Sequence, residues 1–152
     1  MLSLVLKYLY MTIAIINTDM NIGPFRIPGN GQNMITNNYA ERNNFKVEEI
    51  IPEPFKSRSL ATTQWVHKKK RLKIVILCSI HQLPSEKKRI KDLINNMKKV
   101  EFHFALEGIS GKGKRFLLNC IQEAKIFKNA KIIDSQKTSW SNLYKIKNNK
   151  KH

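Results

Sequence analysis

Seven side chains in three short stretches of the chain have the chemistry to bind or transform a polar ligand. An arginine can hold a carboxylate or phosphate through two parallel N–H bonds, and side-chain amides offer donors and acceptors to hydroxyl groups. A histidine titrates near neutrality, and a nearby carboxylate can fix its tautomer or act as a general base. We therefore take His81 and Glu107 as candidate catalytic residues. The candidate ligand-binding residues are Phe25, Arg26, Gln32, Asn33 and Gln82.

Each candidate also has a structural alternative. An arginine in a turn often braces backbone carbonyls, a histidine after a strand often caps the next turn, and a glutamate at a strand end often points into solvent. His103 stands between Phe102 and Phe104 and so faces the other side of its strand from both. We expect it to be a hydrogen-bonded core histidine.

Other patterns for chemistry are weak. Residues 108–115, GISGKGKR, have the composition of a phosphate-binding loop without its GxxxxGK[ST] spacing, so we expect a solvated turn. Cys78 lies in an apolar run and Cys120 in a helical pattern, which predicts reduced, buried thiols and a cytoplasmic location. The four histidines lack metal-ligand spacing, and we expect neither a metal nor another cofactor.

Apolar runs alternate with amphipathic stretches, and this order predicts the elements that position the candidates. Residues 74–77 are continuously apolar, as in a central strand covered on both faces. Five glycines and prolines within residues 23–31 predict a loop without regular structure. The expected strands are 12–17, 45–51, 72–80 and 100–106, with a further edge strand at 131–133. The expected helices are 32–44, 59–67, a helix capped by Ser85 that includes residues 90–97, and 114–128.

This alternation predicts an α/β fold, with a parallel sheet of four to five strands and helices on both faces. Strands 12–17 and 72–80 should be central. Ligands of such sheets lie beyond the carboxyl ends of the strands, where the strand order reverses. The candidate residues should therefore converge on one edge of the sheet.

The length of 152 residues suits one domain. We expect an N-terminal extension over residues 1–10, a single α/β domain over 11–134 and a basic, partly flexible tail over 135–152. The apolar start, MLSLVLKYLY followed by TIAII, lacks a leading basic segment and is interrupted by Lys7. It also falls short of the ~20 apolar residues of a membrane span, so we expect none.

The net charge of +17 is unevenly distributed. Residues 1–55 carry four basic and five acidic side chains, whereas residues 56–152 carry 24 basic and six acidic ones, a net charge of +18. Such a surface attracts the phosphate groups of nucleic acid, nucleotides or anionic lipid. Lys, Asn and Ile share A/T-rich codons, so nucleotide composition is the competing explanation for the charge.

Two motifs resemble a known family. Residues 25–33, FRIPGNGQN, and residues 103–107, HFALE, are similar to the signatures of the bacterial sporadic carbohydrate cluster proteins, which are encoded among surface-polysaccharide biosynthesis genes. The likeness extends over about residues 11–128. It implies a role in a pathway without specifying a reaction.

The element order also resembles the catalytic domain of serine recombinases, the resolvases and invertases. Matching the motifs places Arg26 on that family's arginine, but Pro28 stands where the family has its nucleophilic serine. Gln82 and Ser85 stand where it has two phosphate-binding arginines. Without these groups the covalent phosphoserine link and its charge stabilisation are lost. The resemblance therefore implies a resolvase-like, flavodoxin-like fold without recombinase chemistry.

These observations predict an accessory protein or small enzyme of bacterial surface-carbohydrate (polysaccharide or lipopolysaccharide) biosynthesis. Its ligand would be a sugar, sugar acid or nucleotide-sugar at the edge formed by strands 12–17 and 72–80, and other proteins of the pathway would be partners. The alternative is a catalytically inactive recombinase-like protein with weak, non-specific DNA binding. The sequence leaves open whether catalysis follows binding.

Overall fold

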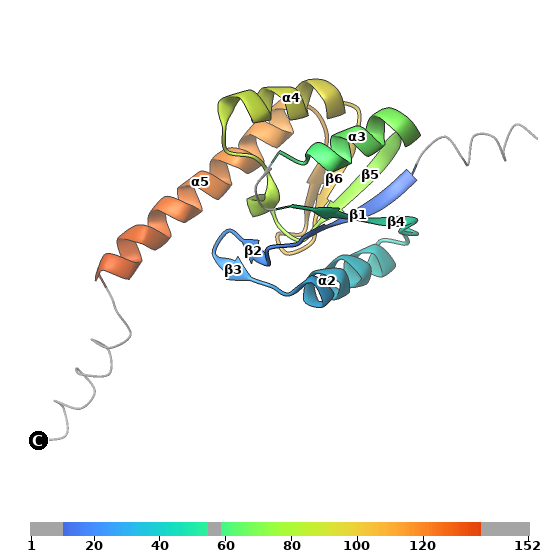
Figure 1. Ribbon diagram of the computed structural model, residues 1–152. Helices are drawn as coiled ribbons and strands as arrows, with labels where there is room; N and C mark the ends of the chain where they lie inside the picture. The colour runs from blue at the N-terminus through green and yellow to red at the C-terminus, as the bar shows by residue number, and fades with distance from the viewer. Residues whose placement is uncertain (1–10, 55–58, 138–152) are drawn as a thin grey trace, which may run out of the picture.

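A five-stranded sheet with helices on both faces forms the centre of the protein (Figure 1). The computed structural model describes residues 11–54 and 59–137, with side chains up to residue 127. The strands of the sheet are β1 (Met11–Asn17), β4 (Glu49–Glu53), β5 (Leu72–Leu77), β6 (Glu101–Phe104) and β7 (Ile109–Gly111). The helices are α2 (Gly29–Arg42), α3 (Ala61–Lys70), α4 (Lys87–Met97) and α5 (Lys114–Lys137).

The strand order is β4-β1-β5-β6-β7, and the first four of these strands are parallel. This confirms the predicted α/β class and the central position of β1 and β5. The chain leaves β1 toward one side of the sheet and returns at β5 on the other, so the order reverses beside β1 as expected.

Side chains alternate along β5 and fill a core on each face of the sheet. Val75 and Leu77 join the larger core, which α3, α4 and α5 cover. Ile74 and Ile76 join a smaller core with Ala40 of α2, on the opposite face (Figure 1). Burial on both faces explains why the sequence of this strand is continuously apolar.

The edge strand β4 differs from the predicted strand 45–51. Pro52 was expected to end the strand but lies within it, opposite Ile16 of β1. The reason is that β4 pairs with β1 alone, and an edge strand tolerates a residue without an N–H donor. Phe45 and Val47 precede the strand and pack against the smaller core, which accounts for their apolar character.

The fifth strand is also not where the sequence indicated. Residues 131–133 lie inside α5, and the fifth strand is β7, which pairs antiparallel with β6. It falls within the stretch predicted to be a solvated turn. The glycines of this stretch serve the hairpin and its packing: a Cβ on Gly111 would lie 2.6 Å from Cδ2 of Phe116.

The predicted loop after β1 contains a short antiparallel ribbon, β2 (Asn21–Ile22) and β3 (Phe25–Arg26). Gly23 and Pro24 form its turn. Residues of these types disfavour helices, but in this segment they form the turn of a hairpin. After β5, which ends at Leu77, the chain forms a 3₁₀ turn, η2 (Ile80–Gln82), rather than extending the strand to residue 80.

Helix α5 begins at Lys114 as predicted, whereas α2, α3 and α4 begin at residues other than those predicted. Helix α2 starts three residues before Gln32, directly after Pro28. Helix α3 follows Leu60, whose φ of +53° turns the chain into the helix in place of a Ser59 cap. Helix α4 follows Glu86 instead of a Ser85 cap.

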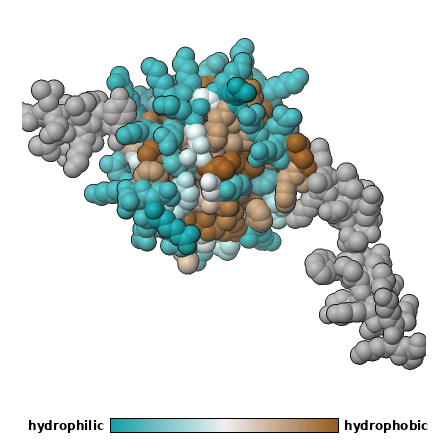
Figure 2. All heavy atoms as spheres, turned by 180° about the vertical axis from the view of Figure 1, so that it is seen from behind, coloured by the Kyte–Doolittle hydropathy of each residue, from teal (hydrophilic) through white to brown (hydrophobic). Residues whose placement is uncertain are grey.

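The ends of the chain lie largely outside the described residues, including the predicted extension 1–10 and residues 138–152 of the predicted tail. Helix α5 runs through residue 134, so the predicted domain boundary falls inside it (Figure 1). Within residues 11–54 and 59–137, no helix is long and apolar enough to cross a membrane. Figure 2 shows apolar side chains gathered in the middle of the rear face, with hydrophilic ones around them.

Candidate functional site

The carboxyl ends of β1 and β5 lie side by side, and two buried glutamines bind them to the loops that follow. Gln32 is fully buried; its Oε1 accepts from the Asn17 N–H at 2.7 Å, and its Nε2 donates to the carbonyls of Asn17 and Ile27 at 2.9 and 2.8 Å. Gln82 is 3% exposed; its Nε2 donates to Asn17 Oδ1 at 3.1 Å and its Oε1 accepts from the Ser79 N–H at 3.2 Å. Both amides are thus engaged within the fold, and this structure does not place them as the ligand-binding groups that the sequence predicted.

The predicted catalytic pair is close but not hydrogen-bonded together. Glu107 Oε1 accepts from Ser79 Oγ at 2.5 Å, and both carboxylate oxygens accept from the Ile80 N–H at 3.3 Å. These bonds fasten the β6–β7 turn to η2. Because Ser79 is buried and its hydroxyl donates its hydrogen bond to Glu107 rather than to the His81 imidazole, these residues do not form an accessible nucleophile with a histidine base.

His81 is held between two aromatic rings. Its imidazole lies edge-on to Phe25 of β3, with ring centroids 6.1 Å apart, and to Phe127 of α5, 5.6 Å apart. Gly23 approaches so closely that a Cβ there would lie 2.3 Å from His81 Cγ. Burial lowers the pKa of His81, against the smaller opposing effect of the Glu107 carboxylate. The imidazole is therefore neutral at pH 7 and docks the β2–β3 ribbon onto η2 and α5.

Three further candidates lie on the exposed rim of this edge. Arg26 is exposed, and its side chain makes no hydrogen bond or ion pair within the described part of the chain. Phe25 is 42% exposed beside it. Asn33, on the first turns of α2, accepts from Asn37 Nδ2 at 3.2 Å through its Oδ1, which leaves its own Nδ2 donor available.

Asp19 is the polar residue of this edge that sequence reasoning missed. It lies in the turn between β1 and β2, and both of its carboxylate oxygens are buried without a hydrogen-bond donor among the described residues. A buried carboxylate without a donor costs several kcal/mol, so Asp19 requires a donor from outside the described residues. Its place directly after the first strand, where ligands of parallel sheets bind, was the available signal.

His103 is a core residue, as predicted. Its Nδ1 lies 2.8 Å from the Tyr39 hydroxyl and its Nε2 lies 2.6 Å from Glu101 Oε1. It is 4% exposed, against α2, on the opposite face of the sheet from α3, α4 and α5. Both cysteines are free and buried, and burial raises the pKa of Cys78 to about 12 and that of Cys120 to about 11. Such thiols are poor nucleophiles.

Comparison with known proteins identifies the fold. No protein-family model matches the chain, and no curated protein matches it either, so these comparisons give no support to the carbohydrate-cluster resemblance. Among solved structures, the N-terminal catalytic domain of TP901-1 integrase matches with a TM-score of 0.54 and 12% sequence identity. The match covers 80% of this chain and 96% of that domain.

The chain has a resolvase-like fold. At 12% identity the likeness concerns the fold alone, and it supports the resemblance to the catalytic domain of serine recombinases. In this fold, Pro28 precedes α2 and carries no hydroxyl, and Arg26 lies on β3. The residues at the matched motif therefore lack a nucleophile.

Proposed function

We propose that this resolvase-like protein binds a sugar, sugar acid or nucleotide-sugar at the carboxyl edge of β1 and β5, as a cytoplasmic accessory protein or small enzyme of surface-carbohydrate biosynthesis. The observation that carries the proposal is Asp19, a carboxylate with two buried oxygens and no donor within the described residues. A ligand hydroxyl or amino group would supply that donor. Metal is a weaker explanation, because the described residues contain no group of three metal-ligating side chains.

The neighbouring side chains suit the rest of such a ligand. The Arg26 guanidinium would hold a carboxylate or phosphate, and the Asn33 amide would donate to a hydroxyl. The exposed Phe25 ring offers an apolar surface on which a sugar ring can stack. The likeness of residues 25–33 and 103–107 to the carbohydrate-cluster signatures supplies the ligand class.

His81 remains our candidate general base, since a neutral imidazole can accept a proton at pH 7. Glu107 is better suited to positioning, because its carboxylate is committed to Ser79 and the Ile80 N–H.

Thermal unfolding of the purified protein in the presence of sugar acids, sugar phosphates and nucleotide-sugars tests this proposal. We expect at least one to raise the melting temperature, and both Asp19→Asn and Arg26→Ala to abolish that increase. Arg42→Ala, at the exposed end of α2, is the matched control and should leave it unchanged. A ligand whose effect survives both edge variants, or the absence of any stabilising ligand, would contradict the proposal.

Nucleic acid is the second candidate, favoured by the fold likeness to an integrase domain and by the +18 charge of residues 56–152. We expect weak, sequence-independent duplex binding, no tighter than about 10⁻⁴–10⁻⁶ M at physiological salt. Fluorescence anisotropy with two unrelated duplexes at about 50 and 200 mM salt tests it. Sequence preference, or salt-resistant nanomolar binding, would make nucleic acid the primary function.

A further inference from the structure

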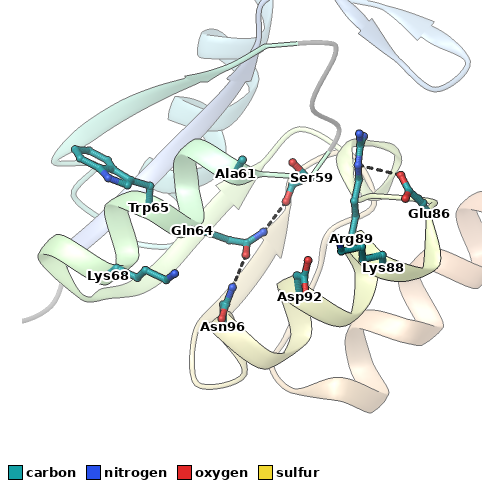
Figure 3. A pocket seen from close by; sticks show the side chains of 10 residues that line it. All are labelled: Ser59, Ala61, Gln64, Trp65, Lys68, Glu86, Lys88, Arg89, Asp92 and Asn96. Carbon is teal, nitrogen blue, oxygen red and sulfur yellow. Dashed lines mark hydrogen bonds and ion pairs between the residues drawn. The ribbon is translucent and has the colours of Figure 1, made fainter.

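A groove of about 520 Å³ lies between α3 and α4 (Figure 3), and it shares no lining residue with the β1–β5 edge site. Its floor is polar and fixed. Gln64, 9% exposed, accepts from Asn96 Nδ2 at 2.8 Å and donates to the Ser59 carbonyl at 2.7 Å. These bonds join the two helices across the groove.

The groove walls are predominantly basic. Lys68 extends from α3 toward α4, and Lys88 and Arg89 lie along α4 (Figure 3). Of the two acidic residues lining the groove, Glu86 pairs with Arg89 at 3.1 Å. Asp92 has no ion pair within residues 11–54 and 59–127, and neither do Lys68 and Lys88. The groove therefore presents two uncommitted cations and one uncommitted carboxylate.

The helices that form the groove carry a strong positive charge. Together α3 and α4 contain seven Lys and Arg residues and one acidic residue, a net charge of +6 with histidine neutral. Arg71 directly after α3 adds to it. A positive groove of this kind attracts anionic chains and raises their local concentration.

Trp65 adds an aromatic surface at the rim of the groove. It is 61% exposed and belongs to neither core cluster. Its indole points away from α4 (Figure 3). The Lys69 ammonium lies 6.0 Å from the ring centroid. An exposed tryptophan ring with a lysine ammonium beside it is a combination on which nucleic-acid bases stack while the phosphates meet cations.

We infer that α3 and the α3–α4 groove beside it bind single-stranded nucleic acid, with Lys68 and Lys88 binding phosphates in the groove and Trp65 as a stacking platform on the side of α3 turned away from α4. The inference rests on the second candidate function, nucleic-acid binding. It adds where the nucleic acid would bind and that a single strand would be preferred to a duplex. Asp92, which has no ion pair among the described residues, would accept from the amino groups of bases. A duplex is disfavoured, because its bases are stacked inside and offer no face to Trp65.

Anisotropy titration of the full chain with a labelled 20-nucleotide oligo-dT and with a duplex of equal length tests the inference. We expect the single strand to bind more tightly and Trp65→Ala to weaken it about 5- to 150-fold, the range for removal of one stacked base. Trp65→Phe should retain most of the affinity. Lys68→Gln with Lys88→Gln should lower the slope of log K against log salt by about 1.4, about 0.7 for each phosphate that is no longer neutralised.

Matched controls separate the groove from general charge. Met34→Ala removes an exposed apolar side chain on α2, and Lys112→Gln with Lys114→Gln removes two cations outside the groove. Asp92→Asn should strengthen binding, because it removes a negative charge from the groove. Two results would show that the groove is not the binding site, while leaving nucleic-acid binding itself in place. One is that Trp65→Ala binds as tightly as Met34→Ala, and the other is that the duplex binds more tightly than the single strand. If neither oligonucleotide binds at about 50 mM salt, the nucleic-acid candidate itself fails.

Discussion

Individual side chains at the β1–β5 edge are mostly committed to holding the fold together. The sequence predicts that Gln32, Gln82 and Glu107 contact a ligand. In the structure, each forms hydrogen bonds with backbone groups or with neighbouring side chains. Asp19 and Arg26 are the exceptions, since neither has a partner among the described residues. Uncommitted polar groups, rather than polar groups in general, are what distinguish a ligand site from a braced loop.

His81 should make stability depend on pH. Burial holds its pKa in the folded protein below the unfolded value of about 6.5, so the unfolded chain binds a proton more readily. The stabilising contribution of the neutral ring is complete above that value and is lost as the pH falls toward and through the folded pKa. We expect the free energy of unfolding, measured in urea at pH 7.5 and 5.5, to fall less on acidification in His81→Gln than in the unmodified protein.

Burial also lowers the pKa of His67, which therefore acts in the same direction. Some loss of unfolding free energy on acidification should thus remain in His81→Gln. An identical decrease in the two proteins would show that His81 is not buried as described.

The two cysteines should be unreactive in the native protein. Their pKa values of about 12 and about 11 leave almost no thiolate at pH 8, and both side chains are buried. A disulfide reagent at pH 8 should react slowly with the native protein and rapidly with two thiols per chain after unfolding in guanidinium chloride. Rapid stoichiometric reaction of the native protein would contradict the buried positions of Cys78 and Cys120.

At the scale of elements, the β2–β3 ribbon depends on a glycine. Gly23 has a φ of +56°, and a Cβ there would lie 2.3 Å from His81 Cγ, whereas Gly108 has a φ of +64° with no atom within 4 Å of its Cβ position. Gly108→Ala should therefore cost only the backbone strain, about 1–2 kcal/mol. Gly23→Ala should cost an additional ~1–3 kcal/mol, because His81 and the ribbon must move. Urea unfolding of both variants measures the difference, and equal costs would mean that the ribbon is not packed against His81.

At the scale of the whole molecule, β1 and β5 should be the most protected elements. They are buried on both faces and have neighbours on both sides in the sheet, whereas β4 and β7 are edges. Amide hydrogen exchange should therefore be slowest in β1 and β5, with protection near that of global unfolding, and faster in β7 and in the β2–β3 ribbon. Faster exchange in β5 than in β7 would contradict the central position of β5.

Local patterns of polarity were sufficient to predict the class of fold and the order of the four parallel strands. A strand that is buried on both faces must be apolar throughout, as residues 74–77 are. A helix with one buried face must repeat its apolar residues at helical spacing, and in α4 these residues are all buried: Ile90, Leu93, Ile94 and Met97. Alternation of such segments with crossovers leads to a parallel sheet, and this prediction is confirmed. The core position of His103 also followed from local alternation along one strand.

The extent of the sheet and the availability of polar groups depend instead on contacts between distant segments. Whether Pro52 ends a strand depends on its lying at an edge, and whether residues 109–111 form a strand depends on pairing with β6. In the same way, the amide of Gln32 and the carboxylate of Asp19 are both simply polar in the sequence, but one finds three backbone partners and the other finds no donor in the described residues. These outcomes depend on interactions between segments far apart in the chain, which local patterns of polarity do not encode.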